Sequence, residues 1–372
     1  ASFVAGRRRT KAMARGSASK GLLIAAGTLL VAIGCARREA KKPSAAPAPK
    51  VVPIAPAPKV GGKARLIVFH AGSLAVPLRE AERAFERKHP NVDVVREASG
   101  SRAAARKVCD LHRTADVLAL ADHAVIEDLL MPQYAKWYVV FARNRMVIAY
   151  TEHSKYADEI GPDNWFEVLA RPDVKFGRSD PNLDPAGYRT LMVWQLADLH
   201  YKRKVKGKSI YEALLHHPKQ EVRPGSVQLL PLLESLDIDY AFEYQSVAMQ
   251  HNLRFVKLPP QIDLGDERFA DLYKRAKVEV TGKKPGERSV YVGMPILYAV
   301  TVPTVSEHPD LAVEFVKLLV GEEGREILKR CFQEPVVPPF CPARFYDALP
   351  AELKPLVAKK ALPAPPRRGK KG

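Results

Sequence analysis

The chain has 372 residues, a hydrophobic fraction of 47% and a formal net charge of +18. Its length and composition are those of a globular protein large enough for two domains. The excess of Lys and Arg lies in residues 1–65 and 359–372, and the body between them is nearly neutral. Because a surface that binds nucleic acid needs its cations on the folded part, this distribution argues against a nucleic-acid partner.

The first 35 residues have the pattern of an export signal. Lys20 precedes an apolar run over residues 21–34, which is short for a membrane span and ends on a small residue before Cys35. Residues 32–35, Ala-Ile-Gly-Cys, are similar to a bacterial lipobox, with alanine where leucine is usual. We therefore predict a lipoprotein signal segment over residues 1–35, with Cys35 carrying the lipid that anchors the exported protein to the membrane. An uncleaved anchor would give the same location.

Two further segments have a composition that cannot bury a core. Residues 36–63 are rich in Ala, Pro and Lys, which is typical of an extended tether whose cations favour an anionic membrane surface. Residues 351–372 are predicted to be a basic, Pro-rich tail.

The cysteines suggest a disulfide and no metal site. Cys331 and Cys341 are ten residues apart, and in an exported protein this spacing allows a disulfide between them. No cysteine spacing is typical of zinc, and no cofactor is predicted.

The first part of the body alternates strands and helices. Short apolar runs predict strands and helical spacing predicts helices, in the order strand 66–70, helix 75–88, strand 91–97, helix 102–111 and strand 115–121. This β-α-β-α-β order predicts a doubly wound parallel sheet.

The remainder repeats the α/β pattern and returns to helices at its end. Strands are predicted over residues 137–142, 146–150, 239–244, 253–258 and 297–302, and helices over 159–169, 185–202, 211–216, 227–233, 311–317 and 325–332. We predict two lobes, each a mostly parallel sheet flanked by helices. Lobe 1 comprises residues 64–149 and 298–350, and lobe 2 comprises residues 150–297.

Two consecutive turns have the order strand, Gly-Ser, helix. Ser73 follows the first strand and Ser101 follows the second. In parallel sheets, ligands bind beyond the carboxyl ends of the strands at helix N-termini, so both hydroxyls are expected to face one crevice. Two plain N-caps would have the same pattern, and capping does not exclude anion binding.

A turn-rich segment over residues 177–189 carries two Asp-Pro steps. Proline keeps the residue before it out of the helical region, so Asp184 is expected in extended backbone and Pro185 at the start of a helix. The free N–H groups of such a helix start suit an anion, although Asp184 could equally be a plain N-cap. Ser226, after Arg-Pro-Gly, is a good N-cap for a later helix.

At this point the motifs match a known family. The segments that carry the match are His70–Leu74, Ala98–Arg102, Ala115–Val117 with Ala121–Asp122, Phe141–Asn144, Arg178–Arg189, and Asp239–Tyr240 with Glu243–Ala248 and Gln250–His251. With these, residues 64–350 resemble the substrate-binding proteins of tungstate/molybdate ABC transporters, in their archaeal-type branch. The resemblance implies a two-lobed periplasmic-binding-protein (type II) fold, a monomer with the ligand in the cleft, an ABC permease as partner and no enzymatic activity.

The resemblance also implies the contacts of the oxyanion. They fall on Ser73 and Ser101, on Asp184 with the backbone at Ala186, on Ser226 and on Tyr244, with Gly72 and Pro185 beside them. A carboxylate near a dianion is tolerable if Asp184 adds to tungsten or molybdenum as an extra ligand, or if it is protonated. The family has a second carboxylate, a glutamate, where this chain has Ser226, so at most five-coordinate or plain tetrahedral binding is expected.

Two other functions are open to the same residues. Sulfate or phosphate is also a tetrahedral oxyanion, but neither can accept a carboxylate ligand. An enzyme with Ser73 or Ser101 as nucleophile would need a base, and His70 is the nearby candidate. No Gly-x-Ser-x-Gly motif supports that enzyme.

Overall fold

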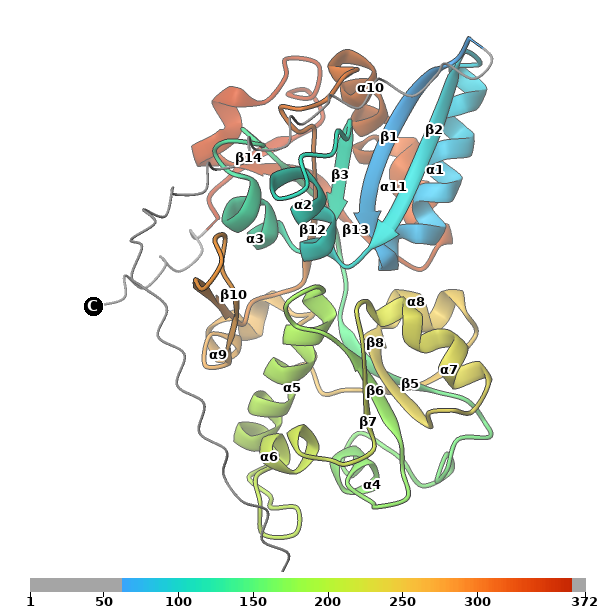
Figure 1. Ribbon diagram of the computed structural model, residues 1–372, viewed down its shortest axis with the longest axis vertical. Helices are drawn as coiled ribbons and strands as arrows, with labels where there is room; N and C mark the ends of the chain where they lie inside the picture. The colour runs from blue at the N-terminus through green and yellow to red at the C-terminus, as the bar shows by residue number, and fades with distance from the viewer. Residues whose placement is uncertain (1–61, 363–372) are drawn as a thin grey trace, which may run out of the picture. The chain divides into compact units, whose positions relative to one another are not determined.

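The structure is a computed structural model that describes residues 62–362. The predicted signal segment, Cys35 and all but the last two residues of the predicted tether lie outside the described residues. Two mixed sheets and a hairpin organise the described part (Figure 1). No helix within residues 62–362 is long and apolar enough to cross a membrane.

The first sheet has seven strands in the order β14-β13-β4-β12-β3-β1-β2. Their bounds are β1 (Ala64–Ala71), β2 (Val92–Ser99), β3 (Val117–Leu120), β4 (Val139–Arg143), β12 (Leu297–Thr301), β13 (Glu334–Pro342) and β14 (Ala358–Lys360). Strand β1 pairs parallel with β2 and β3, as the β-α-β order predicts, whereas β12 pairs antiparallel with β3 and β4. The nearby helices are α1 (Ala75–Lys88), α2 (Ser101–Cys109), α3 (His123–Val125), α10 (Pro309–Val320) and α11 (Glu322–Arg330).

The second sheet has five strands in the order β7-β6-β8-β5-β9. Its strands are β5 (Met146–Tyr150), β6 (Phe176–Ser179), β7 (Gln220–Arg223), β8 (Tyr240–Tyr244) and β9 (Arg254–Lys257). Its helices are α4 (Trp165–Leu169), α5 (Pro185–Tyr201), α6 (Ile210–Leu215), α7 (Leu230–Glu234) and α8 (Gln245–Gln250). Strand β6 pairs parallel with β7 and β8, and β5 pairs antiparallel with β8 and β9.

A separate hairpin and several short turns complete the fold. The hairpin pairs β10 (Lys277–Thr281) with β11 (Arg288–Val292) after helix α9 (Ala270–Tyr273). Short 3-10 helices cover Gly72–Leu74, Ser226–Leu229, Glu267–Phe269 and Ala343–Ala348, and a π-helical turn covers Ile126–Leu130. The chain leaves the first sheet after Arg143, enters the second at Met146 and returns at Leu297. The bounds of the two lobes stay a prediction.

An aromatic cluster fills the second sheet's core. The Phe242 ring lies 5.5 Å from that of Trp194 and 5.9 Å from that of Trp165, both edge-on. All three side chains are fully buried. Edge-to-face contacts of this kind stabilise a core beyond the area that they bury, so the cluster holds helices α4 and α5 against β8.

Three predicted elements differ from the structure. The helix expected over residues 159–169 begins only at Trp165, because turns occupy the residues before it. The helix expected over 227–233 is a tight turn followed by the short α7, which begins beside Pro231. The chain after α11 does not end in helices, because β13 and β14 extend the first sheet to Lys360, within the predicted tail.

The disulfide considered for Cys331 and Cys341 is not formed, and both thiols are free. Cys331 ends helix α11, whereas Cys341 lies at the far end of β13. Along β4, Glu334 pairs with Arg143 and Phe340 pairs with Val140. These two pairs are three residues apart on β4, so β13 extends by roughly 10 Å between Glu334 and Phe340. Disulfides need Cα atoms closer than about 7 Å.

A buried arginine links elements of different sheets. Arg102, from α2, is completely buried. It donates to the Asn182 carbonyl at 3.1 Å, to the Tyr291 hydroxyl at 2.7 Å and to the Thr281 carbonyl. One guanidinium therefore ties the first sheet's helix layer to the loop before α5 and to the hairpin.

We predict that Arg102→Met lowers the free energy of unfolding by about 3 kcal/mol, because the two carbonyls and the hydroxyl lose a buried, charged donor. Urea denaturation followed by circular dichroism measures the change. Arg83→Met is the control, since Arg83 pairs with Glu80 at the surface and such pairs contribute less than about 1 kcal/mol. Equal losses in both variants would contradict the assigned role of Arg102.

Candidate oxyanion-binding site

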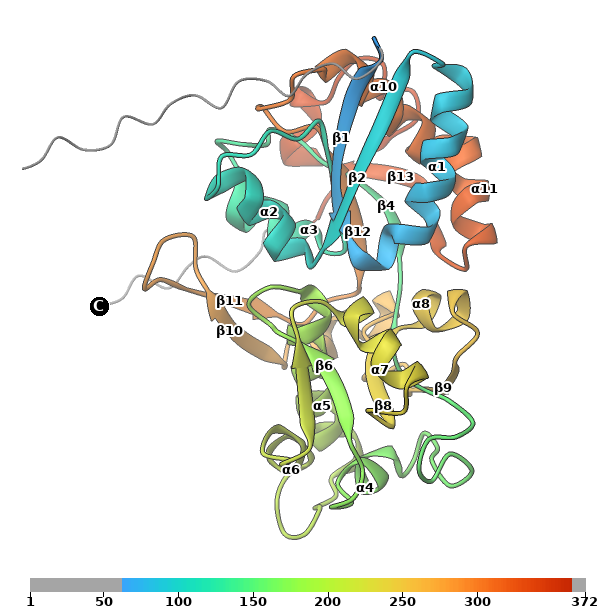
Figure 2. The ribbon, with the colours of Figure 1, turned by 45° about the vertical axis from the view of Figure 1, so that its right-hand side comes forward.

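A cavity of about 110 Å³ lies where segments from both sheets meet. Figures 1 and 2 show the start of α1 and the turn after β2 facing helices α7 and α8. The residues that line the cavity are Gly72, Ser73, Ala98, Ser99, Gly100, Ala103, Asp184, Pro224, Gly225, Ser226, Val227, Gln228 and Tyr244. No Lys or Arg is among these described residues. The cavity is smaller than the 300–1,000 Å³ typical of pockets for organic ligands.

Ser73 lies directly after β1, in the turn that begins α1. Its hydroxyl is 2.9 Å from the Tyr298 hydroxyl, and its side chain is nearly buried. The neighbouring Gly72 permits close approach of the other side of the cavity, since a Cβ at that position would lie 2.8 Å from Val227. Both residues line the cavity, as expected from the sequence.

Ser101 begins α2 and lies beside the cavity without lining it. Its Oγ accepts a hydrogen bond from the Ala121 N–H at 2.9 Å. Gly100 lines the cavity instead, where a Cβ would lie 2.4 Å from the Leu183 carbonyl oxygen. The N-terminus of α2 therefore packs directly against the segment that precedes α5.

Asp184 both caps α5 and lines the cavity. Its Oδ1 accepts from the Ala186 N–H at 3.3 Å, and its Oδ2 accepts from the Ser226 N–H at 2.8 Å. Burial raises the pKa of Asp184, whereas these two N–H groups and the charge of Arg189 act in the opposite direction. Pro185 and Ala186 are buried but do not line the cavity, and the Ala186 N–H faces Asp184.

Tyr244 ends β8 and brings a hydroxyl to the opposite wall. Arg189 donates to this hydroxyl at 2.7 Å and to the Ala121 carbonyl at 2.9 Å. It also pairs with Asp122 at 3.0 Å. Sequence analysis assigned Arg189 no role, although an arginine among the apolar residues of α5 indicates a buried partner.

Glu243 is a second carboxyl group that sequence analysis missed. It is completely buried on β8, and its Oε2 accepts from the Tyr244 N–H at 2.8 Å, whereas its Oε1 has no described partner. Burial raises the pKa of Glu243 to about 8, the Tyr244 N–H and the Ser226 hydroxyl lower it, and the charge of Asp184 raises it. A glutamate in the otherwise apolar run of residues 240–244 was the available signal.

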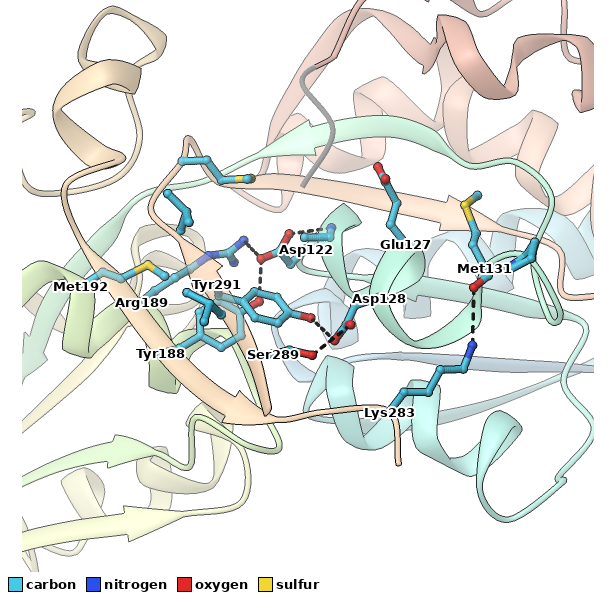
Figure 3. A pocket seen from close by; sticks show the side chains of 15 residues that line it. Asp122, Glu127, Asp128, Met131, Tyr188, Arg189, Met192, Lys283, Ser289 and Tyr291 are labelled. Atoms are coloured by element: carbon cyan, nitrogen blue, oxygen red, sulfur yellow. Dashed lines mark hydrogen bonds and ion pairs between the residues drawn. The ribbon is translucent and has the colours of Figure 1, made fainter. Parts of the chain in front are cut away.

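Arg189 lines a larger cavity of about 430 Å³ (Figure 3). Asp122 lines this cavity and forms an ion pair with Arg189. It also accepts a hydrogen bond from the Tyr188 hydroxyl at 2.5 Å. Across the cavity, Asp128 accepts from the hydroxyls of Ser289 and Tyr291. The carboxylates at this wall therefore hold neighbouring side chains in place. Within residues 62–362, no cluster of three or more His, Cys, Asp or Glu could hold a metal cation.

A small cavity between two α/β sheets, lined by neutral polar groups and one carboxyl group, suits the binding of a small solute. The profile of the family described as bacterial extracellular solute-binding protein matches residues 66–331. The chain belongs to this family, whose members are exported binding proteins with a transport role. The predicted α/β class of two lobes is confirmed, although both sheets mix parallel and antiparallel pairs.

Three relatives define the comparison more closely. A solute-binding protein of Petrotoga mobilis is 49% identical over 275 residues, which cover 74% of this chain and 84% of that one. The molybdate/tungstate-binding protein WtpA of Pyrococcus abyssi is 43% identical over 325 residues, covering 80% and 91%. The periplasmic molybdate-binding protein of Azotobacter vinelandii has the same fold, with a TM-score of 0.51, 16% identity, and coverage of 72% and 98%. The family resemblance inferred from the motifs is thus confirmed.

The raised pKa of Glu243 predicts a pH-dependent stability. Between about pH 5 and pH 8 the folded protein keeps a proton that the unfolded chain releases, so the free energy of unfolding falls as pH rises. The slope reaches about 1.4 kcal/mol per pH unit and ends above about pH 8. Urea denaturation of the ligand-free protein across this range measures it.

Glu243→Gln should remove this slope and stabilise the protein most at the upper end of the range. Glu234→Gln, at an exposed position of α7, is the control and should leave the slope unchanged. A slope that persists in Glu243→Gln would show that another group binds the proton.

Proposed function

We propose that this protein is the extracytoplasmic solute-binding component of an ABC importer and that it captures tungstate, molybdate or both. The observation that carries the proposal is the buried carboxylate of Asp184 in a small cavity whose other polar lining consists of hydroxyl, amide and backbone groups. The curated relative from Pyrococcus abyssi bears the name of a molybdate/tungstate-binding protein, which supports the same ligand.

Neutral donors suit a tetrahedral dianion. Such an anion offers only acceptors, so the site must supply hydroxyl and N–H donors. We assign the hydroxyls of Ser73, Ser226 and Tyr244 to the anion, together with the N-terminus of α2 at Gly100 and Ser101. The lining residues include no Lys or Arg, whose charge would attract every anion alike. The fixed positions of the donors therefore decide which anion fits.

Asp184 distinguishes tungstate and molybdate from other oxyanions. Its oxygens accept from two backbone N–H groups, and the Ser179 hydroxyl also interacts with them. Because a carboxylate has about four lone-pair sites, one is still left for a ligand. Tungsten and molybdenum can accept such an oxygen as an additional ligand, whereas sulfur and phosphorus in their oxyanions cannot. A carboxylate at this position repels sulfate without compensation and therefore favours the larger metal oxyanions.

The position of the second carboxyl group limits the coordination of the metal. Glu243 lies beside Ser226 but does not line the cavity, so it does not replace the glutamate that the family has at position 226. We therefore propose that the bound tungsten or molybdenum is at most five-coordinate, with Asp184 as its carboxylate ligand. Ser226 would donate a hydrogen bond to an oxygen of the anion.

The remaining parts of the proposal concern location and partners. We propose that Cys35 carries a lipid that anchors a monomer to the membrane, and that residues 36–63 serve as the tether. Residues 64–149 and 298–350 would form one lobe and residues 150–297 the other, and the permease would receive the anion from between them.

We predict that residues 62–362 bind tungstate and molybdate tightly and give no measurable heat with sulfate or phosphate. Isothermal titration calorimetry with each anion in turn measures this selectivity. Sulfate or phosphate binding as tight as that of the metal oxyanions would overturn the proposed ligand and leave the solute-binding family unaffected.

Asp184→Asn is predicted to weaken tungstate and molybdate binding about tenfold or more, because the metal loses a charged ligand. Asparagine still caps a helix, so the start of α5 is preserved. Residual sulfate binding should rise, since the repulsion disappears. Asp266→Asn makes the same change at a comparable cap that does not line the cavity, and it should change neither affinity. An unchanged tungstate affinity in Asp184→Asn would contradict metal ligation by Asp184.

A further inference from the structure

A buried tyrosine connects the cavity to the crossover between the two sheets. Tyr298, on β12, is completely buried and does not line the cavity. Its hydroxyl lies 2.9 Å from Ser73 Oγ and 3.3 Å from Asn144 Nδ2. Asn144 lies between β4 and β5, where the chain passes from one sheet to the other. The described hydrogen bonds of Tyr298 therefore join the candidate site to the crossover.

Backbone groups fix which way the Asn144 amide faces. Its Oδ1 accepts from the Arg145 N–H at 3.0 Å and from the Ser246 N–H at 3.4 Å. Because a backbone N–H can only donate, the oxygen of the amide must occupy that side. The NH₂ group consequently faces Ser246 Oγ at 2.8 Å, Gln333 Oε1 at 3.3 Å and the Tyr298 hydroxyl, and it can only donate to each of them.

This orientation determines the direction of the next two hydroxyls. Since the Tyr298 oxygen accepts from Asn144, its single proton is left for Ser73 Oγ, which is its other described partner. Burial raises the pKa of Tyr298, so the phenol keeps that proton at neutral pH. The proton of Ser73 then has no described acceptor within the protein and is left for a ligand in the cavity that Ser73 lines.

We propose that Tyr298 is a positioning residue of the site, which orders the Ser73 hydroxyl as a donor to the bound anion and hinders it from accepting a hydrogen bond. This inference rests on the proposed function in that it takes the cavity to be the anion site. It does not depend on which dianion binds there.

Two further hydroxyls, one beside the cavity and one on its lining, are held in the same way. Ser101 Oγ accepts from the Ala121 N–H, and the Tyr244 hydroxyl accepts from Arg189. Both partners can only donate. The hydroxyls of Ser73, Ser101 and Tyr244 thus each accept a hydrogen bond from a group that occupies one lone pair of the oxygen. The proton of each hydroxyl is therefore left for a ligand. Hydroxyls ordered in this way offer no acceptor to a protonated anion, so they favour an anion with no proton, such as tungstate, over hydrogen phosphate.

A double-mutant cycle on residues 62–362 tests the proposal. Tyr298→Phe should weaken tungstate binding about three- to tenfold, the effect of one ordered hydroxyl. In a Ser73→Ala background the same change should have less than about a twofold effect, because the hydroxyl that Tyr298 orders is gone. Equal losses in both backgrounds would overturn the proposal and assign Tyr298 a purely structural role.

Competition by hydrogen phosphate provides a second readout, which a structural role would not move. At about pH 8 phosphate is mainly a dianion with one proton. In Tyr298→Phe, Ser73 Oγ becomes free to accept that proton, so the preference for tungstate over hydrogen phosphate should fall at least threefold. Tyr240→Phe is the matched control, since its buried hydroxyl on β8 bonds the Lys155 carbonyl outside the cavity. It should leave the preference unchanged.

The outcomes separate the two proposals. If sulfate binds in place of tungstate, the proposed ligand fails, and the same cycle is then measured with sulfate. An unchanged preference in Tyr298→Phe overturns the positioning role whichever dianion binds. Absence of binding of every tetrahedral dianion to the unaltered protein overturns both proposals.

Discussion

The arrangement of the site depends on the buried guanidinium of Arg189. A buried cation is costly unless it is paired and hydrogen-bonded, so its partners must stay in place. Those partners are Asp122 and the Ala121 carbonyl, directly after β3 of the first sheet, and the Tyr244 hydroxyl at the end of β8 of the second. The guanidinium therefore fixes the wall of the cavity that carries Tyr244 relative to the segment that holds Ser101. It does so without lining the cavity itself.

This arrangement would allow the proposed anion site to work without a cation on its wall. The charge of Arg189 is balanced by Asp122 (Figure 3), and neither residue lines the small cavity. Its effect on the site is local, because it donates to a neutral hydroxyl that in turn can donate to a ligand. Glu243 fits the same pattern, since burial raises its pKa and its neutral form adds no negative charge beside Asp184. The one carboxylate on the wall is then Asp184, which two backbone N–H groups hold.

The sequence predicted the local parts of this structure better than their combination. The Gly-Ser turns and the Asp184 cap lie where proline, glycine and apolar periodicity place them, because these signals act over a few residues. Strand β13 was missed because its four prolines read as loop, although a pairing irregularity accommodates them. The hairpin of β10 and β11 was missed although Val278 and Val280 alternate with polar residues, which is the pattern of a half-buried strand. Tyr298 and Arg189 could not be assigned, since their roles depend on partners 225 and 55 residues away in the chain.

The same long-range contacts explain why binding and lobe position are expected to be coupled. Ser246, in the first turn of α8 directly after Tyr244, shares the Asn144 amide with Tyr298 and also bonds Gln333. Rotation of one sheet relative to the other at the crossover would pull on the amide that orders Ser73 and on the helix that follows Tyr244. A bound anion that requires both hydroxyls as donors therefore stabilises one position of the crossover, because only in that position are both protons directed at the cavity.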